Sequence, residues 1–262
     1  MEDPVRSLSR EKTRVIRSLS SRKVRERRKL CIVEGENSLA ECHRTGMLEY
    51  LVLMEGAESD MPMSISGAGQ SDVPVYGADP SLFAEVSDVA RSTGSIGVGR
   101  IPGEPELGSV MDDEGGSAIL FLDAVQDPGN VGGLLRSAWG FGFRAALIGT
   151  GSADPFGPKA VRASAGGVFH IPVITSVGKE ELTSLVSSGF ELFTADSRGS
   201  SMDEVLFPSR SILALGNESS GLSPWLEGLG SRVAVPMAAG VDSLNVVVAG
   251  SIIMEKMASA AN

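Results

Sequence analysis

The sequence has 262 residues, of which 42% are hydrophobic, as is typical of a globular protein with one large or two smaller domains. Its longer apolar stretches, such as Val246–Ile253, are interrupted by Gly and Ser and are too short to cross a bilayer. No apolar segment near the N-terminus resembles a secretory signal, and acidic residues among the first 26 argue against a mitochondrial transit peptide. We therefore expect a cytoplasmic protein that does not bind a membrane.

The sequence contains two cysteines, Cys31 and Cys42, and two histidines, His43 and His170. Their spacing does not match a four-ligand zinc site, so we predict no metal site. Two cysteines of this kind indicate reduced, buried thiols in a cytoplasmic protein. Neighbouring side chains on a helix point apart, so the adjacent Cys42 and His43 do not favour a catalytic pair.

The net charge of −10 is unevenly distributed along the chain. Residues 1–30 contain eleven Lys or Arg and four acidic residues, whereas the remaining 232 residues contain 12 basic and 29 acidic ones. A short basic segment in an acidic protein is a candidate site for the phosphate groups of a nucleic acid. A solvated helix face is the alternative interpretation of the same charges.

The first hundred residues show an alternating pattern of helices and short strands. We expect a basic helix over 5–29, strands over 30–33, 50–54, 73–76 and 96–98, helices over 36–44 and 80–90, and a loop over 56–72. Residues 101–116 are rich in Pro, Gly and acidic residues and form the best linker in the chain. The sequence therefore predicts an N-terminal domain over 1–105, a linker over 106–116 and a C-terminal domain over 117–262.

In the C-terminal domain, apolar strands alternate with amphipathic helices. We expect strands over 118–122, 145–149, 168–174, 190–195, 211–215 and 232–235, and helices over 131–140, 158–165, 178–188, 223–229 and 244–258. This alternation predicts a mostly parallel α/β sheet covered on both faces. Ligands of such sheets bind at the carboxyl ends of strands, so the loops that follow the strands are the candidate sites.

The first of these loops is Asp127–Arg136. Asn130 is a natural N-cap, which predicts a helix from residue 131 with Arg136 nearly two turns inside it. A guanidinium on an otherwise small and apolar helix needs an anion, because it stays charged and offers five donors. The guanidinium either forms a salt bridge with a nearby acidic side chain or clamps the phosphate or ribose of a ligand.

The second loop, Gly216–Leu222, directly follows a buried strand, and its glycines let the backbone turn sharply. Glu218 could bind ribose hydroxyls, hold a neighbouring backbone amide, orient Arg136 or simply face solvent. The third loop is Val235–Asn245, in which Ser243 could cap the final helix and leave Asn245 in its first turn.

Nucleotide-binding fingerprints of the familiar kinds do not fit the sequence. It has no P-loop pattern, and Gly149-Thr150-Gly151 lacks the third glycine of a dinucleotide site.

Taken together and in this order, the three loops closely resemble the motifs of the SpoU/TrmH branch of the SPOUT RNA methyltransferases. These motifs are an Asn-x-Gly-x-x-x-Arg helix, a Gly-x-Glu-x-x-Gly loop and a Pro-Met…Gly-x-x-Ser-Leu-Asn-Val segment. Arg162–Gly166 and Ile171–Val173 also look like the family, so that the resemblance covers 118–258. It extends more loosely over 12–55, where the basic helix and Val33-Glu34-Gly35 resemble the family's small α/β, ribosomal-protein-like RNA-binding domain.

The resemblance implies a SPOUT-type α/β knot, that is, a trefoil-knotted and mostly parallel sheet, which sequence patterning alone could not show. It also implies an S-adenosyl-L-methionine cofactor, an RNA substrate and a homodimer in which Arg136 lies near the partner's cofactor. The implied catalytic residues are Asn130, Arg136, Glu218, Ser243 and Asn245. The implied cofactor-binding residues are Leu215, Gly216, Val235, Met237 and Leu244. The expected RNA-binding residues lie in the basic helix and are Arg14, Arg22, Lys23, Arg25, Arg27, Arg28 and Lys29.

The implied reaction is an attack of a ribose 2′-oxygen on a sulfonium methyl group, and it needs no metal. In the family proposal the arginine equivalent to Arg136 is a base, but a guanidinium is a very weak acid, so an electrostatic clamp is physically easier. An appended domain favours ribosomal RNA over tRNA as the substrate. The alternatives are a tRNA 2′-O-methyltransferase, a non-catalytic RNA-binding or ribosome-assembly factor, and a nicotinamide-dependent oxidoreductase.

Overall fold

The computed structural model describes residues 6–56, 73–86, 94–112 and 118–260. They form two compact units, one containing Met1–Pro102 and Asp154–His170 and the other Gly103–Ala153 and Ile171–Asn262. The loop expected over 56–72 lies outside the described residues, apart from residue 56. The last residues of the helix expected over 80–90 and of the linker also lie outside them.

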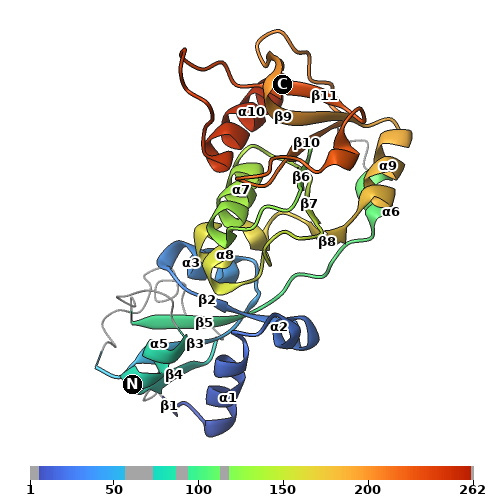
Figure 1. The fold of residues 1–262 in the computed structure, drawn as a ribbon. Coiled ribbons are helices and arrows are strands. Elements are labelled where there is room, and N and C mark those ends of the chain that lie inside the picture. Colours follow the sequence, from blue (N-terminus) through green and yellow to red (C-terminus); the bar gives the residue numbers. More distant parts are fainter. Residues whose placement is uncertain (1–5, 57–72, 87–93, 113–117, 261–262) are drawn as a thin grey trace. The chain divides into compact units, whose positions relative to one another are not determined.

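Unit 1 is built on a mixed five-stranded sheet of order β1-β4-β3-β5-β2 (Figure 1). Its strands are β1 (Arg6–Ser7), β2 (Leu30–Val33), β3 (Leu48–Met54), β4 (Val75–Ala78) and β5 (Ser95–Arg100). Its helices are α1 (Arg10–Ser18), α2 (Arg22–Arg28), α3 (Glu36–Arg44), α5 (Pro80–Val86), α8 (Pro158–Ala163) and the 3₁₀ turn η2 (Gly167–Phe169). The β2–β5 and β3–β5 pairs are antiparallel, whereas β4 pairs in parallel with β1 and β3. A core containing Ile16, Val52 and Phe83 joins α1 and α5 to the sheet.

The single basic helix expected over 5–29 is wrong, because the segment forms β1, α1 and α2. Ser9 caps α1 by accepting a hydrogen bond from the Lys12 amide at 3.2 Å, so the helix cannot begin at residue 5. The chain turns after Leu19, which is fully buried, and the amide of Ser21 donates to the carbonyl of Ser18 at 3.1 Å. The turn directs α2 along a new axis.

Unit 2 contains a six-stranded sheet of order β11-β9-β10-β6-β7-β8, in which every pair of neighbours is parallel. Its strands are β6 (Ile119–Leu122), β7 (Ala145–Gly149), β8 (Val173–Val177), β9 (Glu191–Ser201), β10 (Ser211–Leu215) and β11 (Ser231–Ala234). Its helices are α6 (Leu107–Asp112), α7 (Pro128–Gly140), α9 (Lys179–Ser187), α10 (Val246–Ala260) and the 3₁₀ turn η3 (Pro224–Leu226). The predicted α/β class with a mostly parallel C-terminal sheet is confirmed.

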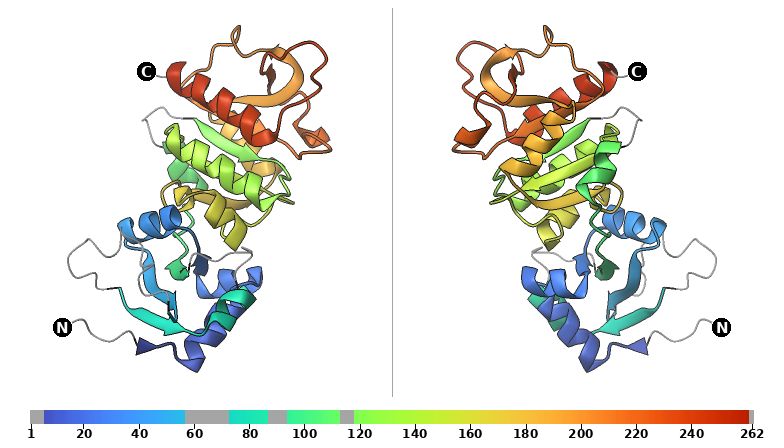
Figure 2. Two further views of the ribbon diagram at one scale, coloured as in Figure 1. Left: turned by 90° about the vertical axis from the view of Figure 1, so that its left-hand side faces the viewer. Right: turned by 90° about the vertical axis from the view of Figure 1, so that its right-hand side faces the viewer.

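Helices α7 and α10 lie side by side in unit 2, drawn in yellow-green and red in Figure 2. The hydroxyls of Ser137 on α7 and Ser251 on α10 are 2.7 Å apart and share a hydrogen bond. Gly250 makes the close approach possible, because an added Cβ would lie 2.6 Å from Leu215 and 2.8 Å from Leu134. Leu215, the last residue of β10 before the second loop, is therefore packed against the last helix.

Three expected elements of unit 2 differ in the structure. The strand expected over 168–174 begins only at Val173, because Val168 and Phe169 are buried in η2, and an apolar run does not distinguish the two. The helix expected over 223–229 is only η3, since the chain is extended at Glu227 and Gly228 has a positive φ of 77°. Part of the expected linker forms α6, whose Leu107, Val110 and Met111 pack on the core of the sheet.

Candidate active site

The ends of β6, β10 and β11 lead into the three loops singled out in the sequence. Strands β6 and β10 pair in parallel, and Leu122 lies opposite Leu215, so the first and second loops leave the same edge of the sheet side by side. Two hydrogen bonds join the residues that flank these loops: the Asp123 amide donates to the Leu215 carbonyl at 2.8 Å, and the Ser223 hydroxyl donates to the Asp123 carboxylate at 2.9 Å.

Helix α7 begins at Pro128 and not at residue 131, and its N-cap is Asp127 instead of Asn130. The Asp127 carboxylate accepts a hydrogen bond from the Asn130 amide at 3.0 Å, and proline is well suited to the first helical position. The Asn130 side chain is therefore not used as a cap. Its Nδ2 donates to Glu218 Oε1 at 2.7 Å, which links the first loop to the second.

Glu218 holds neighbouring amides, which is one of the four roles considered for it, and its side chain is also exposed to solvent. Besides Asn130, its carboxylate accepts from the backbone amides of Gln126 and Asp127, both at 3.4 Å. Partial burial alone raises its pKa, but the hydrogen bonds from the Asn130 side chain and these amides hold the pKa of Glu218 below its ordinary value. No hydrogen bond or ion pair joins Glu218 to Arg136 in the described part of the chain.

Asn217 organises the second loop from inside, a role that the sequence reasoning missed. Its Oδ1 accepts from the amides of Ser219 and Ser220 at 2.9 and 3.0 Å and from the Ser219 hydroxyl at 2.8 Å. Its Nδ2 donates to the Ala124 carbonyl at 2.9 Å, which ties the loop to the end of β6. An Asn followed by two serines directly after a buried strand is a known turn pattern and could have revealed this role.

The final helix is capped by Asn245, and the expectation that Ser243 caps it is wrong. Asn245 Oδ1 accepts from the amides of Val247 and Val248 at 2.8 and 3.4 Å, which leaves Ser243 outside the helix. Asn245 Nδ2 also donates to Asn130 Oδ1 over 3.5 Å. Asn130 therefore lies between Glu218 and Asn245, so the three loops meet through their polar side chains.

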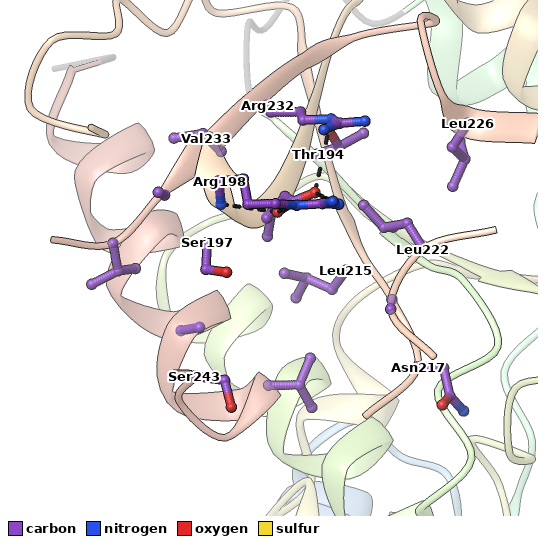
Figure 3. A pocket seen from close by; sticks show the side chains of 18 of the residues that line it. Thr194, Ser197, Arg198, Leu215, Asn217, Leu222, Leu226, Arg232, Val233 and Ser243 are labelled. Atoms are coloured by element: carbon purple, nitrogen blue, oxygen red, sulfur yellow. Dashed lines mark hydrogen bonds and ion pairs between the residues drawn. The ribbon is translucent and has the colours of Figure 1, made fainter. Parts of the chain in front are cut away.

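A pocket of about 830 Å³ opens beside these loops, and this volume is in the range of small-molecule sites. It is lined by all five residues expected to bind the cofactor, namely Leu215, Gly216, Val235, Met237 and Leu244. Three of the expected catalytic residues also line it, namely Glu218, Ser243 and Asn245. Figure 3 shows Leu215 near the centre and Ser243 at the start of the last helix. Apolar side chains and exposed main-chain groups suit a nucleoside-like cofactor, so the residues present fit S-adenosylmethionine.

The far side of the pocket carries charged residues that the sequence reasoning did not single out. Strand β9 interrupts its ladder with β11 between Thr194 and Ser200, and residues between them line the pocket. There Arg198 binds Asp196 through Nη2 at 2.8 Å, and Arg232 approaches the same carboxylate at 3.8 Å (Figure 3). The hydrogen bond from Arg198 lowers the pKa of Asp196 to about 2.

Arg136 is exposed on α7 and does not line the pocket. A salt bridge to a nearby acidic residue was one interpretation of this arginine, but its side chain makes no ion pair among the described residues. Its guanidinium is therefore available to an anion from outside this chain. Asn130 also does not line the pocket and reaches it only through Glu218 and Asn245.

The basic N-terminal residues expected to bind RNA fall into two groups. Six are exposed, namely Arg14, Arg22, Lys23, Arg27, Arg28 and Lys29. Arg25 is a correction: it is only 5% exposed, and its guanidinium binds Asp154 and the carbonyls of Leu19 and Ser20. A side chain held in this way is not available to an RNA phosphate.

The cysteine thiols are free and buried in unit 1. Burial raises the pKa of Cys42 to about 12 and raises the pKa of Cys31 well above its ordinary value, so neither is a reactive thiolate. Within the described ranges, no cluster of three or more His, Cys, Asp or Glu side chains could hold a metal ion. No described helix is long and apolar enough to cross a membrane.

A parallel α/β sheet with a nucleoside-sized pocket at its strand ends defines an enzyme-like, cofactor-binding domain. The profile of the SpoU rRNA methylase family matches residues 117–255, which contain all three loops. The chain belongs to this family, and the resemblance seen in its motifs is confirmed. The trefoil knot implied by that resemblance stays a prediction.

Two of the relatives that match most of the chain are named as 23S rRNA methyltransferases. The 23S rRNA (guanosine(2553)-2'-O)-methyltransferase RlmP of Bacillus subtilis is 27% identical over 253 residues, which cover 95% of this chain and 97% of that protein. The 23S rRNA (adenosine(1067)-2'-O)-methyltransferase of Streptomyces azureus is 26% identical over 223 residues, 83% of this chain and 82% of that protein.

Solved structures share the fold over nearly the whole chain. A putative RNA methyltransferase of the TrmH family from Porphyromonas gingivalis is 30% identical with a TM-score of 0.76, covering 95% of this chain and 98% of its own. The SpoU methyltransferase AviRb from Streptomyces viridochromogenes, in complex with AdoMet, has a TM-score of 0.82 at 22% identity, covering 96% of this chain and 98% of its own. At that identity the likeness is one of fold.

Proposed function

We propose that this protein is an S-adenosylmethionine-dependent RNA 2′-O-methyltransferase that acts on ribosomal RNA. The observation that carries the proposal is the convergence of three loops, in a chain of the SpoU rRNA methylase family, through the hydrogen bonds Glu218–Asn130–Asn245 at the edge of one pocket. Two of the relatives that align along most of the chain are named as 23S rRNA 2'-O-methyltransferases, which supports ribosomal RNA over tRNA.

The pocket would hold the cofactor with Leu215, Val235 and Leu244 against its apolar surface and with main-chain groups around Gly216. Bound S-adenosylmethionine supplies an activated methyl group on a sulfonium, which is already a good leaving group. The remaining task of the protein is to orient the ribose hydroxyl and to ease loss of its proton. Ser243 and Asn245 line the pocket and carry the polar atoms for this orientation.

Arg136 is the group that we assign to the RNA backbone. A guanidinium does not give up its proton at neutral pH, so it acts by binding the phosphate next to the target ribose and by stabilising the developing alkoxide. Because Arg136 does not line the pocket of its own chain, it would serve the pocket of a second copy. Trp139, 36% exposed and one turn further along α7, and Val248, 48% exposed on α10, provide apolar surface for such a homodimer.

The Arg136→Ala variant tests this assignment. We expect calorimetry to give an unchanged affinity for S-adenosylmethionine and tritium transfer to a 23S ribosomal RNA transcript to be lost, since one oxyanion-type contact is typically worth a factor of about 10² to 10³. Mixing this variant with a pocket variant, Gly216→Val, should restore part of the activity through mixed dimers, each with one intact site. Retained turnover of Arg136→Ala would remove Arg136 from the mechanism, and a mixture without activity would contradict the shared site.

The substrate is tested by mapping 2′-O-methyl groups in ribosomal RNA from cells with and without the protein. A ribosomal site that disappears with the protein supports the proposal. Loss of a methyl group from tRNA instead, or transfer to neither RNA, would overturn the substrate or the activity.

A further inference from the structure

Arg25, on α2, binds partners from two other parts of unit 1 and so links three parts of this unit. Its Nη1 donates to the carbonyls of Leu19 and Ser20, at 2.7 and 2.9 Å, which lie at the C-terminal end of α1. Its Nε donates to Asp154 Oδ2 at 3.0 Å, and its Nη2 binds the same carboxylate. The side chains are only 6% and 15% exposed, so the pair is shielded from water and from salt.

Asp154 belongs to a segment that the chain contributes much later, between β7 and β8. Two further contacts bind this segment, Asp154–His170, to the N-terminal part of unit 1: Arg162 Nη1 to Glu34 Oε2, just after β2, at 3.0 Å, and His170 Nε2 to Glu41 Oε2, on α3, at 2.8 Å. Glu34 is 5% exposed, so this ion pair is also largely buried on one side. The segment is thus fastened to unit 1 by three pairs of side chains.

Besides these ion pairs, the segment makes close van der Waals contacts with α3. Gly166 has a φ of +91°, and an added Cβ would lie 2.3 Å from Glu41 Cβ, so the backbone of the segment rests directly on α3. Ser38 on the same helix donates its hydroxyl to the Val161 carbonyl at 3.2 Å. The segment is an integral part of unit 1 and not a loop passing over it.

We propose that Arg25 and Asp154 are positioning residues for RNA binding. The pair fixes α2 relative to α1 and to the late segment, so that the exposed Arg27, Arg28 and Lys23 present their charges to the RNA in one arrangement. Fixing these side chains in advance removes part of the ordering cost of binding. The inference rests on the proposed RNA-binding role of unit 1, which it deepens.

Two substitutions separate positioning from direct contact. Arg25→Lys keeps the charge but loses the planar fork that reaches Asp154 and two carbonyls at once. A residue that only contacted phosphate would tolerate this change, whereas a positioning residue would not. Asp154→Asn removes a negative charge, which on electrostatic grounds alone should strengthen RNA binding. We expect Asp154→Asn to weaken RNA binding instead.

The experiment uses the full chain and a 23S ribosomal RNA transcript as the probe, with binding measured from 50 to 200 mM salt. We expect both variants to bind about tenfold more weakly, equivalent to about 1.4 kcal/mol, with the wild-type slope of log K against log salt. The control Arg27→Ala removes an exposed charge, so its slope should fall by about 0.7 to 0.9. Affinity for S-adenosylmethionine should stay within twofold of wild type in all three.

Each outcome is decisive for the inference. Wild-type RNA affinity in Arg25→Lys, tighter binding in Asp154→Asn, or a reduced salt slope in Arg25→Lys would overturn it. If Arg25→Lys fails to fold, Asp154→Asn still carries the test, because the two explanations predict opposite signs for it. A wild-type protein that does not bind the transcript would instead contradict the proposed function, and the two failures are therefore distinguishable.

Discussion

Replacing Asn217 by Ala should weaken cofactor binding without removing any group that we assign to the chemistry. The side chain is 9% exposed and makes four hydrogen bonds, one to the end of β6 and three within the pocket loop. Each such bond contributes about 0.5 to 1.5 kcal/mol net. Ser219 and Ser220 are exposed, so water replaces part of the loss, and we expect a net cost of about 2 kcal/mol.

Part of this free-energy cost should appear as a loss of folding stability, and part as weaker binding of the cofactor. A loop that is disordered in the free protein must be ordered when the cofactor binds, so the Kd for S-adenosylmethionine should rise by up to about 30-fold, the equivalent of about 2 kcal/mol. Isothermal titration calorimetry measures the Kd, and a thermal melt measures the remaining loss. Ser220→Ala is the matched control, because the network uses only the backbone amide of Ser220. A Kd within twofold of wild type for Asn217→Ala would refute the reasoning.

Two further predictions concern packing and protonation. Gly250→Ala should destabilise the protein by about 1 to 3 kcal/mol in chemical denaturation, because its Cβ would lie 2.6 Å from Leu215 in a packed core. The control is Gly140→Ala, whose Cβ would meet nothing within 4 Å, so it should be neutral or slightly stabilising. Equal effects of the two substitutions would contradict the steric argument. Since the folded-state pKa of Glu218 lies below its ordinary value, its ionised form contributes stability that is complete above the unfolded pKa and is lost as the pH falls through the folded one. Melting temperatures from pH 7 to pH 3 should therefore fall more steeply for the wild type than for Glu218→Gln, and parallel curves would contradict this role.

The sequence predicted the pocket better than it predicted the details that build it. Leu215, Val235 and Leu244 were expected to bind the cofactor because of the family resemblance, and the three loops do meet at strand ends that parallel pairing brings to one edge. The helix caps were predicted at the wrong residues. Asp127 and Asn130 are equally good capping residues, and so are Ser243 and Asn245, so that propensity does not decide between them.

The sequence also did not predict contacts between residues that are far apart along the chain. Arg25 and Asp154 are 129 positions apart, and a basic residue in a basic segment gives no local sign that it will be buried. Arg27 and Arg28, close to Arg25 in the sequence, are the same type of residue but are exposed to solvent. Asn217 was not predicted for a different reason: the charged Glu218 next to it is the more obvious candidate from the sequence, although the Asn217 side chain makes the shorter hydrogen bonds within the loop.

The discontinuity of unit 1 has a consequence for how the protein is made on the ribosome. Residues up to Pro102 emerge first, yet Arg25 and Glu34 bind partners that are translated only after residue 153. At about 5 to 20 residues per second, synthesis from residue 102 to residue 170 takes roughly 3 to 14 s. During that interval Asp154 and Arg162 have not yet been made, so unit 1 cannot complete its fold before Gly103–Ala153 of the other unit has been synthesised.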